Sequence, residues 1–290
     1  MEYQYTMPEV TKNMNTNLIY RGDCHSVLKR NFPENSIDLI YIDPPFSFDP
    51  KYARLWYDKE TLEMFDEMRE GKVKHYIGWM SKRLEQCHRV LKDTGSIYLH
   101  CDWKFGHYLK VEMDNIFNRN NFQNEIIWAY KSGGSTKKRF SRKHDTIFLY
   151  SKSNNYIFNP LKEKSYNRNL KPYRFKGVKE YEDEIGWYTL VNMKDVWNID
   201  MVGRTSKERM GYFTQKPEEL LRRIILSCTD KCDVVLDPFL GSGTTSFVAK
   251  TLGRNSIGIE KEKKYLKIIE KRMNPPQRKI NEETKLEIKI

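Results

Sequence analysis

The 290-residue sequence lacks long apolar runs and the features of an exported chain. No run approaches the roughly 20 apolar residues that span a bilayer. The N-terminal residues, MEYQYTMPEV, contain neither the apolar core nor the small-residue cleavage site of a signal peptide. Charged residues make up 31% and hydrophobic residues 39%, which excludes a disordered chain. We therefore expect a cytoplasmic, globular protein with a substantial core.

Cysteine is scarce, and its count of five does not suit a complete disulfide framework. The cysteines are Cys24, Cys87, Cys101, Cys228 and Cys232. Three of them adjoin a histidine, which raises the alternative of zinc. However, no CxxC pair occurs, and adjacent side chains point in different directions on a strand or a helix. We expect buried free thiols and no metal site.

Acidic residues are fewer than basic ones, 39 against 51, so the formal net charge is +12. Residues 131–209 hold 18 Lys and Arg against 9 Asp and Glu, a net of +9. A positive field of this size attracts a polyanion and speeds encounter with it. The alternative is a basic surface that is merely solvated.

Short apolar runs that end in an acidic residue recur along the chain. Residues 37–42 end at Asp43, 234–236 at Asp237 and 256–259 at Glu260, and 18–20 lead to Gly22 and Asp23. Such runs are typical of parallel strands that helices cover on both faces. Ligands bind at the carboxyl ends of these strands, where the acids would lie.

Helical patterns alternate with these runs. Residues 218–227 carry an apolar face after Pro217, 244–252 end before Gly253, and 77–91 precede an expected strand at 96–100. The alternation predicts a doubly wound α/β sheet. Residues 151–210 break the pattern with scattered aromatic side chains, so we interpret them as an inserted subdomain. The residues from about Pro275 have the composition of a charged tail.

The segment from Asp237 to Thr245, DPFLGSGTT, follows an expected strand and opens a helix. Its glycines permit a tight turn, and a helix N-terminus offers free N–H groups to a carboxylate or phosphate. Glu260 ends the next strand, where an acid can accept hydrogen bonds from ribose hydroxyls. No Lys follows the glycines as in an NTPase loop, and Ser246 stands where a dinucleotide fingerprint has Gly or Ala. An ordinary glycine-rich turn is the remaining alternative.

The tetrapeptide Asp43-Pro44-Pro45-Phe46 closes another strand. Its two prolines remove two backbone donors and impose a rigid, extended path. The Pro44 carbonyl and the Asp43 carboxylate could both accept from an amine, while Phe46 could stack on a base. Two acceptors would stabilise the positive charge that develops on an amine during attack. The alternative is a Pro-Pro turn that Asp43 caps.

Together the two motifs resemble those of DNA amino-methyltransferases that act on adenine N6 or cytosine N4. The catalytic tetrapeptide precedes the cofactor glycines, the permuted order of that family's beta class. The resemblance covers residues 17–273. It includes three further landmarks: Gly22-Asp23, Asp195-Val196-Trp197 and Thr214-Gln215-Lys216-Pro217. It implies an S-adenosylmethionine-dependent methyltransferase with a Rossmann-like doubly wound sheet and an inserted target-recognition region.

The resemblance also assigns roles. Contact with the methionine part of S-adenosylmethionine is implied for Asp237, Phe239, Gly241, Ser242, Gly243 and Thr244. Glu260 would bind its ribose, Asp23 its adenine and Lys216 its carboxylate, and Asp43 would lie beside it. The catalytic group that holds the flipped base would be Asp43, Pro44, Pro45 and Phe46. Phe46 replaces the commoner Tyr, and Asp rather than Ser before Pro-Pro resembles the adenine branch.

The resemblance divides the chain into a catalytic half (1–150), a target-recognition insertion (151–210), a cofactor-binding half (211–275) and a tail (276–290). We expect site-specific methylation of adenine N6 in double-stranded DNA by base flipping and direct displacement. The densest basic cluster, which we expect to bind DNA from a loop between two strands, comprises Lys137, Lys138, Arg139, Arg142 and Lys143. Cytosine N4, an RNA or protein-amide substrate, and a non-catalytic DNA-binding module are alternatives. A homodimer and a separately encoded restriction endonuclease stay open as partners.

Overall fold

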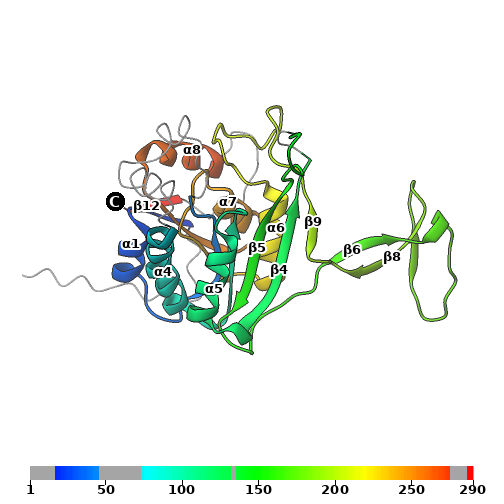
Figure 1. Cartoon of the computed structure of the whole chain (residues 1–290), viewed down its shortest axis with the longest axis horizontal. Coiled ribbons are helices and arrows are strands. Elements are labelled where there is room, and N and C mark those ends of the chain that lie inside the picture. The colour runs from blue at the N-terminus through cyan, green and yellow to red at the C-terminus, as the bar shows by residue number, and fades with distance from the viewer. Residues whose placement is uncertain (1–16, 46–72, 132–134, 275–285, 290) are drawn as a thin grey trace, which may run out of the picture.

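The computed structural model describes residues 17–45, 73–131, 135–274 and 286–289. Nine strands form one sheet in the order β12-β1-β11-β10-β2-β3-β5-β4-β9. All except β5 run in the same direction. The strands are β1 (Asn17–Arg21), β2 (Ile37–Ile42), β3 (Leu91–Cys101), β4 (Phe122–Ala129), β5 (His144–Ser151), β9 (Val196–Asn198), β10 (Val234–Asp237), β11 (Asn255–Glu260) and β12 (Leu286–Lys289). Figure 1 labels β12, β5, β4 and β9 of this sheet.

Helices cover both faces of this sheet. The first face packs on α1 (Cys24–Asn31), α4 (Val73–Val90) and α5 (Gly106–Phe117). The second face packs on α6 (Glu218–Cys228), α7 (Thr244–Thr251) and α8 (Lys263–Met273). Successive residues of a strand point to opposite faces, so Leu39 and Ile40 of the fully buried β2 enter different apolar clusters. The doubly wound α/β fold expected from the sequence is confirmed. No helix in the described ranges is long and apolar enough to cross a membrane.

The predicted elements agree with the structure except near their ends. The helix expected over 77–91 begins earlier, at Val73, and β3 begins at Leu91. The tail expected from 276 contains an edge strand, because β12 pairs with β1. The expectation of buried thiols is confirmed for four cysteines but is wrong for Cys232, which is exposed. Cys232 lies in the turn before β10 with a left-handed φ of 70°.

A second, three-stranded sheet stands apart from the body at the right of Figure 1. It consists of β6 (Lys162–Tyr166), β7 (Glu180–Glu182) and β8 (Trp187–Asn192), with β8 in the middle. Short 3-10 helices lie at Arg119–Asn121 and Arg168–Leu170. The chain then returns to the main sheet through β9. The range 151–210 thus holds a separate sheet and a strand of the body, and its role in recognition stays a prediction.

The strand order reverses between β10 and β2. From β2 the chain proceeds through α4 to β3 on one side, and from β10 it proceeds through α7 to β11 on the other. The two central strands are joined by backbone pairing and by the Val234 N–H, which donates to Asp38 Oδ2 at 2.9 Å. A crevice forms outside the carboxyl ends of strands at such a switch point. The motifs that start with Asp43 and Asp237 both begin at this crevice, at the ends of β2 and β10.

Candidate active site

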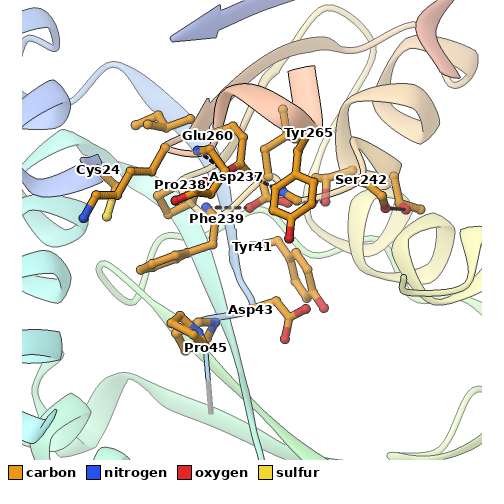
Figure 2. A pocket seen from close by; sticks show the side chains of 18 of the residues that line it. Cys24, Tyr41, Asp43, Pro45, Asp237, Pro238, Phe239, Ser242, Glu260 and Tyr265 are labelled. Atoms are coloured by element: carbon orange, nitrogen blue, oxygen red, sulfur yellow. Dashed lines mark hydrogen bonds between the residues drawn. The ribbon is translucent and has the colours of Figure 1, made fainter. Parts of the chain in front are cut away.

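One pocket occupies this switch point and brings the two motifs together (Figure 2). Its wall includes Asp43, Pro44 and Pro45 from the end of β2 and the turn between β10 and α7. Gly22 and Asp23 after β1 and Glu260 at the end of β11 complete the same edge. Phe46, expected to stack on a base, lies outside the described residues. The expected site residues that line the pocket are Asp23, Asp43, Pro44, Pro45, Lys216, Asp237, Phe239, Gly241, Ser242, Thr244 and Glu260.

The glycine turn owes its shape to two left-handed residues, Gly241 (φ +54°) and Gly243 (φ +77°). Gly243 comes directly before α7, and a Cβ there would lie 3.2 Å from the Ile269 side chain of α8. Its left-handed φ and this close contact make the glycine necessary for the turn and its packing. Gly243 is not among the residues that line the pocket, and its expected contact with the cofactor stays a prediction. Gly241 does line it, and a Cβ there would lie 3.0 Å from the Tyr212 hydroxyl.

Two buried carboxyl groups, those of Asp237 and Glu260, accept hydrogen bonds from this turn. Burial raises the pKa of Asp237 to about 7, although Thr245 Oγ1 (2.5 Å) and the Phe239 N–H (3.0 Å) donate to it. Burial also raises the pKa of Glu260 to about 7, although it accepts from the N–H groups of Glu262 and Gly241. Both carboxyls therefore respond strongly to a ligand that brings positive charge or hydrogen-bond donors.

Aromatic rings form the wall beside Asp23. Trp79 of α4 lies 5.8 Å from Phe239 between ring centroids, and the guanidinium of Arg83 stacks on Trp79 at 3.6 Å. Arg83 also pairs with Asp23 Oδ2 at 2.5 Å, while Asp23 Oδ1 caps α1 through the Ser26 N–H. Burial opposes ionisation of Asp23, but the charge of Arg83 outweighs it with the help of Ser26 and holds the pKa below its usual value. A flat apolar wall beside an ionised carboxylate suits a planar base with an exocyclic amine.

Asp43 is held by an ion pair across the pocket. Lys216, which precedes α6, donates from Nζ to Asp43 Oδ2 and to the Thr214 carbonyl at 3.3 Å. The sequence predicts instead that Lys216 binds the cofactor's carboxylate, an assignment that stays a prediction. Pro44 is buried and Pro45 half-buried beside Asp43, so the rigid turn is part of the pocket wall.

A second group of polar residues, which the sequence analysis missed, lies behind Asp43. His100 of β3 is 0% exposed and lies between Asp43 and Asp145 of β5. Its Nδ1 faces the Tyr41 hydroxyl at 3.0 Å, and its ring packs in a T-shaped arrangement with Trp128. No motif marks these residues, since 59 residues separate Tyr41 from His100. Strand alternation is the one available signal, because it places Tyr41 on the same face as Asp43.

The basic cluster lies in the connection between β4 and β5, as predicted. These strands are antiparallel, so the loop leaves the sheet at the edge where Asp43 lies. The guanidinium of Arg142 stacks 3.3 Å above the Trp103 ring, which is 48% exposed. Phe140, within the cluster, is 98% exposed. No sequence motif marks Trp103, which follows β3, or Phe140, which lies among the charges of this loop.

Comparison with known proteins decides the family. The family model N6_N4_Mtase, described as DNA methylase, matches residues 37–271. The chain belongs to this family of DNA methylases. The type II methyltransferase M.BglII of Bacillus subtilis is 34% identical over 278 residues, which cover 90% of this chain and 70% of that protein. The DNA adenine methyltransferase YhdJ of Escherichia coli is 32% identical over 260 residues, which cover 86% of this chain and 80% of that protein. The family predicted from the sequence is therefore confirmed.

Solved structures share the fold of this methyltransferase. The cytosine-N4-specific PvuII DNA methyltransferase matches with a TM-score of 0.63 at 18% identity, covering 91% of this chain and 90% of that one. The M1.HpyAVI–SAM complex matches with a TM-score of 0.55 at 22% identity, covering 89% and 99%. These likenesses confirm the Rossmann-like methyltransferase architecture.

Proposed function

We propose that this DNA methyltransferase transfers a methyl group from S-adenosylmethionine to adenine N6 in double-stranded DNA, as the modification enzyme of a particular sequence. The observation that carries the proposal is the single pocket in which Asp43-Pro44 meets the glycine turn and Glu260. Asp before Pro-Pro favours adenine, and so does the likeness to a relative named as a DNA adenine methyltransferase. The type II methyltransferases among the relatives support a modification role.

The residues of the pocket fit S-adenosylmethionine by their chemistry. Glu260 and Asp23 offer carboxylate oxygens to hydroxyl and amine donors, and Trp79 and Phe239 offer aromatic surface to a nucleobase. The N-terminus of α7, where Thr244 and Thr245 line the pocket, presents backbone N–H groups. When bound, the cofactor supplies a methyl group activated by its sulfonium charge.

Asp43 and the Pro44 carbonyl would hold the hydrogens of the target amine. The amine lone pair of adenine is delocalised into the ring, so the free amine is a poor nucleophile. Two fixed acceptors stabilise the positive charge that appears on the nitrogen as it takes the methyl group. Asp43 acts as an orienting acceptor and not as a strong base, because a carboxylate is a weak base. An amine inside the duplex does not reach this recessed pocket, so the base is flipped out of the stack.

The loop between β4 and β5 supplies the proposed DNA contact nearest the pocket. It carries the five side chains of the basic cluster and rises from the same sheet edge as Asp43. Arg142 is held above Trp103 and Phe140 projects into solvent, so the surface combines charge with aromatic rings. This combination suits a phosphate backbone and bases that have lost their stacking.

Product analysis tests the proposal. DNA from cells that express the protein is digested to nucleosides, and mass spectrometry measures methylated adenine and cytosine. We expect N6-methyladenine, with little N4-methylcytosine. The Asp43→Ala variant is the control, because it loses an acceptor of the amine and should bind S-adenosylmethionine while leaving the DNA unmodified. A dominant N4-methylcytosine signal would overturn the adenine assignment, and normal turnover by Asp43→Ala would overturn the role of Asp43.

A further inference from the structure

Three side chains form a hydrogen-bonded line behind the pocket wall, and each comes from a different strand. His100 Nε2 lies 3.2 Å from Asp145 Oδ2, and His100 Nδ1 lies 3.0 Å from the Tyr41 hydroxyl. Strand alternation turns all three residues toward the face that α6, α7 and α8 cover. Tyr41 ends the line at the pocket, where Figure 2 shows its hydroxyl beside the Asp43 carboxylate.

The direction of the hydrogen bond at His100 Nε2 follows from its partner. Burial raises the pKa of Asp145, but the hydrogen bond from His100, nearby positive charge that includes Lys216, and the hydrogen bond from Tyr130 (3.2 Å) together hold it below its usual value. Asp145 is therefore a carboxylate that only accepts, so His100 Nε2 carries the hydrogen. His100 Nδ1 is 3.6 Å from Asp43 Oδ1, too long for a hydrogen bond, whereas the Tyr41 oxygen is in range.

Tyr41 has a hydrogen to donate. Burial, with the charges of Asp43, Asp237 and Asp145, raises the pKa of its hydroxyl well above the usual value, so the phenol stays neutral. A neutral phenol has one O–H and two lone pairs. If the O–H points at Nδ1, the lone pairs of the oxygen are left for the pocket.

We propose that Asp145 and His100 lock the Tyr41 hydroxyl as a hydrogen-bond acceptor toward the pocket, where it shares with Asp43 one of the two hydrogens of the target amine, while the Pro44 carbonyl holds the other. This inference rests on the proposed function. Tyr41 is then a catalytic residue, while His100 and Asp145 are positioning residues. A hydroxyl that was free to rotate would turn its own hydrogen toward the amine in part of the molecules, whereas a fixed lone pair costs no reorganisation as charge develops.

Nitrogen NMR of the ligand-free protein tests the hydrogen-bond directions without any turnover. The chain has six histidines, and 15N-labelling resolves their ring tautomers. We expect His100 to show a protonated Nε2 and an unprotonated Nδ1. Tyr41→Phe should shift the Nδ1 signal alone, because it removes the hydrogen bond to that atom. A doubly protonated ring, or a hydrogen on Nδ1, would overturn the proposal, since Tyr41 would then accept from the ring.

Kinetics test the consequence for the reaction. Tyr41→Phe should lower kcat by about 10- to 100-fold, as loss of one hydrogen bond to a charged group does, while the dissociation constant of S-adenosylmethionine stays within about twofold. Asp145→Asn should also lower kcat, but should cost nothing further in the Tyr41→Phe background because both changes act through one hydroxyl. Tyr98→Phe is the matched control. Tyr98 is also buried on this face, but its hydroxyl bonds Ser227 and so kcat should not change.

The outcomes separate this inference from the proposed function. Normal kcat in Tyr41→Phe, or losses that simply add in the double variant, would overturn the role of the line. Absence of methyl transfer by the unmodified protein would overturn the proposed function, while the NMR result would still report the tautomer of His100.

Discussion

We propose that Asp237 and Glu260, which line the pocket, couple cofactor binding to protons. Burial raises the pKa of each to about 7 in the ligand-free pocket, so at lower pH both are largely protonated. A sulfonium cation and ribose hydroxyl donors favour the ionised forms, so binding releases protons. The affinity for S-adenosylmethionine should therefore rise from about pH 5 to about pH 7, by about tenfold per unit for each proton released, and then level off. Calorimetry in buffers of different ionisation enthalpy measures the released protons directly.

The Glu260→Gln variant is the control for this proton linkage, because it removes one of the two titrating groups. It should release about one proton fewer than the unmodified protein. The same groups act oppositely on the ligand-free fold. Because their pKa values are raised in the fold, the contribution of these two groups to the stability is highest below about pH 4. This contribution is lost as the pH rises through about 7. Affinity that stays flat across this range would contradict the linkage.

At this scale the sequence predicts residues that belong to a contiguous motif and misses those that do not. Asp43, Gly241 and Glu260 follow strands in recognisable order, so they could be placed in one pocket before the structure was known. His100 and Asp145 could not, because 45 residues separate them and each is an ordinary position in its own strand. Their contact depends on the register between β3 and β5, which no local pattern fixes.

At the scale of single elements, the loop between β4 and β5 allows the contributions of charge and of apolar contact to DNA binding to be measured separately. Each of the five residues of the basic cluster in this loop is replaced singly by Gln, and binding to cognate and scrambled duplexes is measured against salt. A residue that contacts phosphate should, when replaced, weaken both duplexes equally and lower the salt slope by about one unit. A residue that reads guanine should instead cost roughly 1–3 kcal/mol at one base position.

Phe140→Ala is the matched control in the same loop, because Phe140 is fully accessible and uncharged. It should weaken binding without changing the salt slope. Unchanged affinity and slope across all five Gln variants would remove the basic cluster from the DNA interface. The position of this loop could be predicted from the two flanking strands, whereas the stacking of Arg142 on Trp103 joins elements that no sequence pattern pairs.

For the whole molecule, the three-stranded sheet should be separable from the methyltransferase body. Lys162 at the start of β6 pairs with Asn192 at the end of β8, and their side chains are 2.6 Å apart. A short turn can therefore replace residues 163–191 and leave both flanking connections where they are. We expect such a variant to bind S-adenosylmethionine as tightly as before and to lose discrimination between cognate and scrambled duplexes. Calorimetry and binding competition measure the two properties.

Retained discrimination in this shortened variant would show that recognition lies elsewhere, and lost cofactor binding would show that the body needs the second sheet. The sequence predicts the doubly wound sheet well because each strand–helix unit carries its own pattern. It does not predict that β9 returns to the main sheet or that β12 pairs with β1, since both are short strands at the sheet edges. Edge pairing leaves little hydrophobic signal.

The central pairing of β2 with β10 also governs how the protein is made. The residues joined by the Val234–Asp38 hydrogen bond are 196 positions apart, so a ribosome needs roughly 10 to 40 s to connect them at about 5–20 residues per second. Throughout that time β2, which is wholly buried in the finished fold, lacks its neighbour on one side and is a template for aggregation. S-adenosylmethionine offers the nascent chain no protection, because Asp237 and Glu260 are made after that interval. Synthesis of this enzyme should therefore depend on chaperones more than the stability of the finished fold suggests.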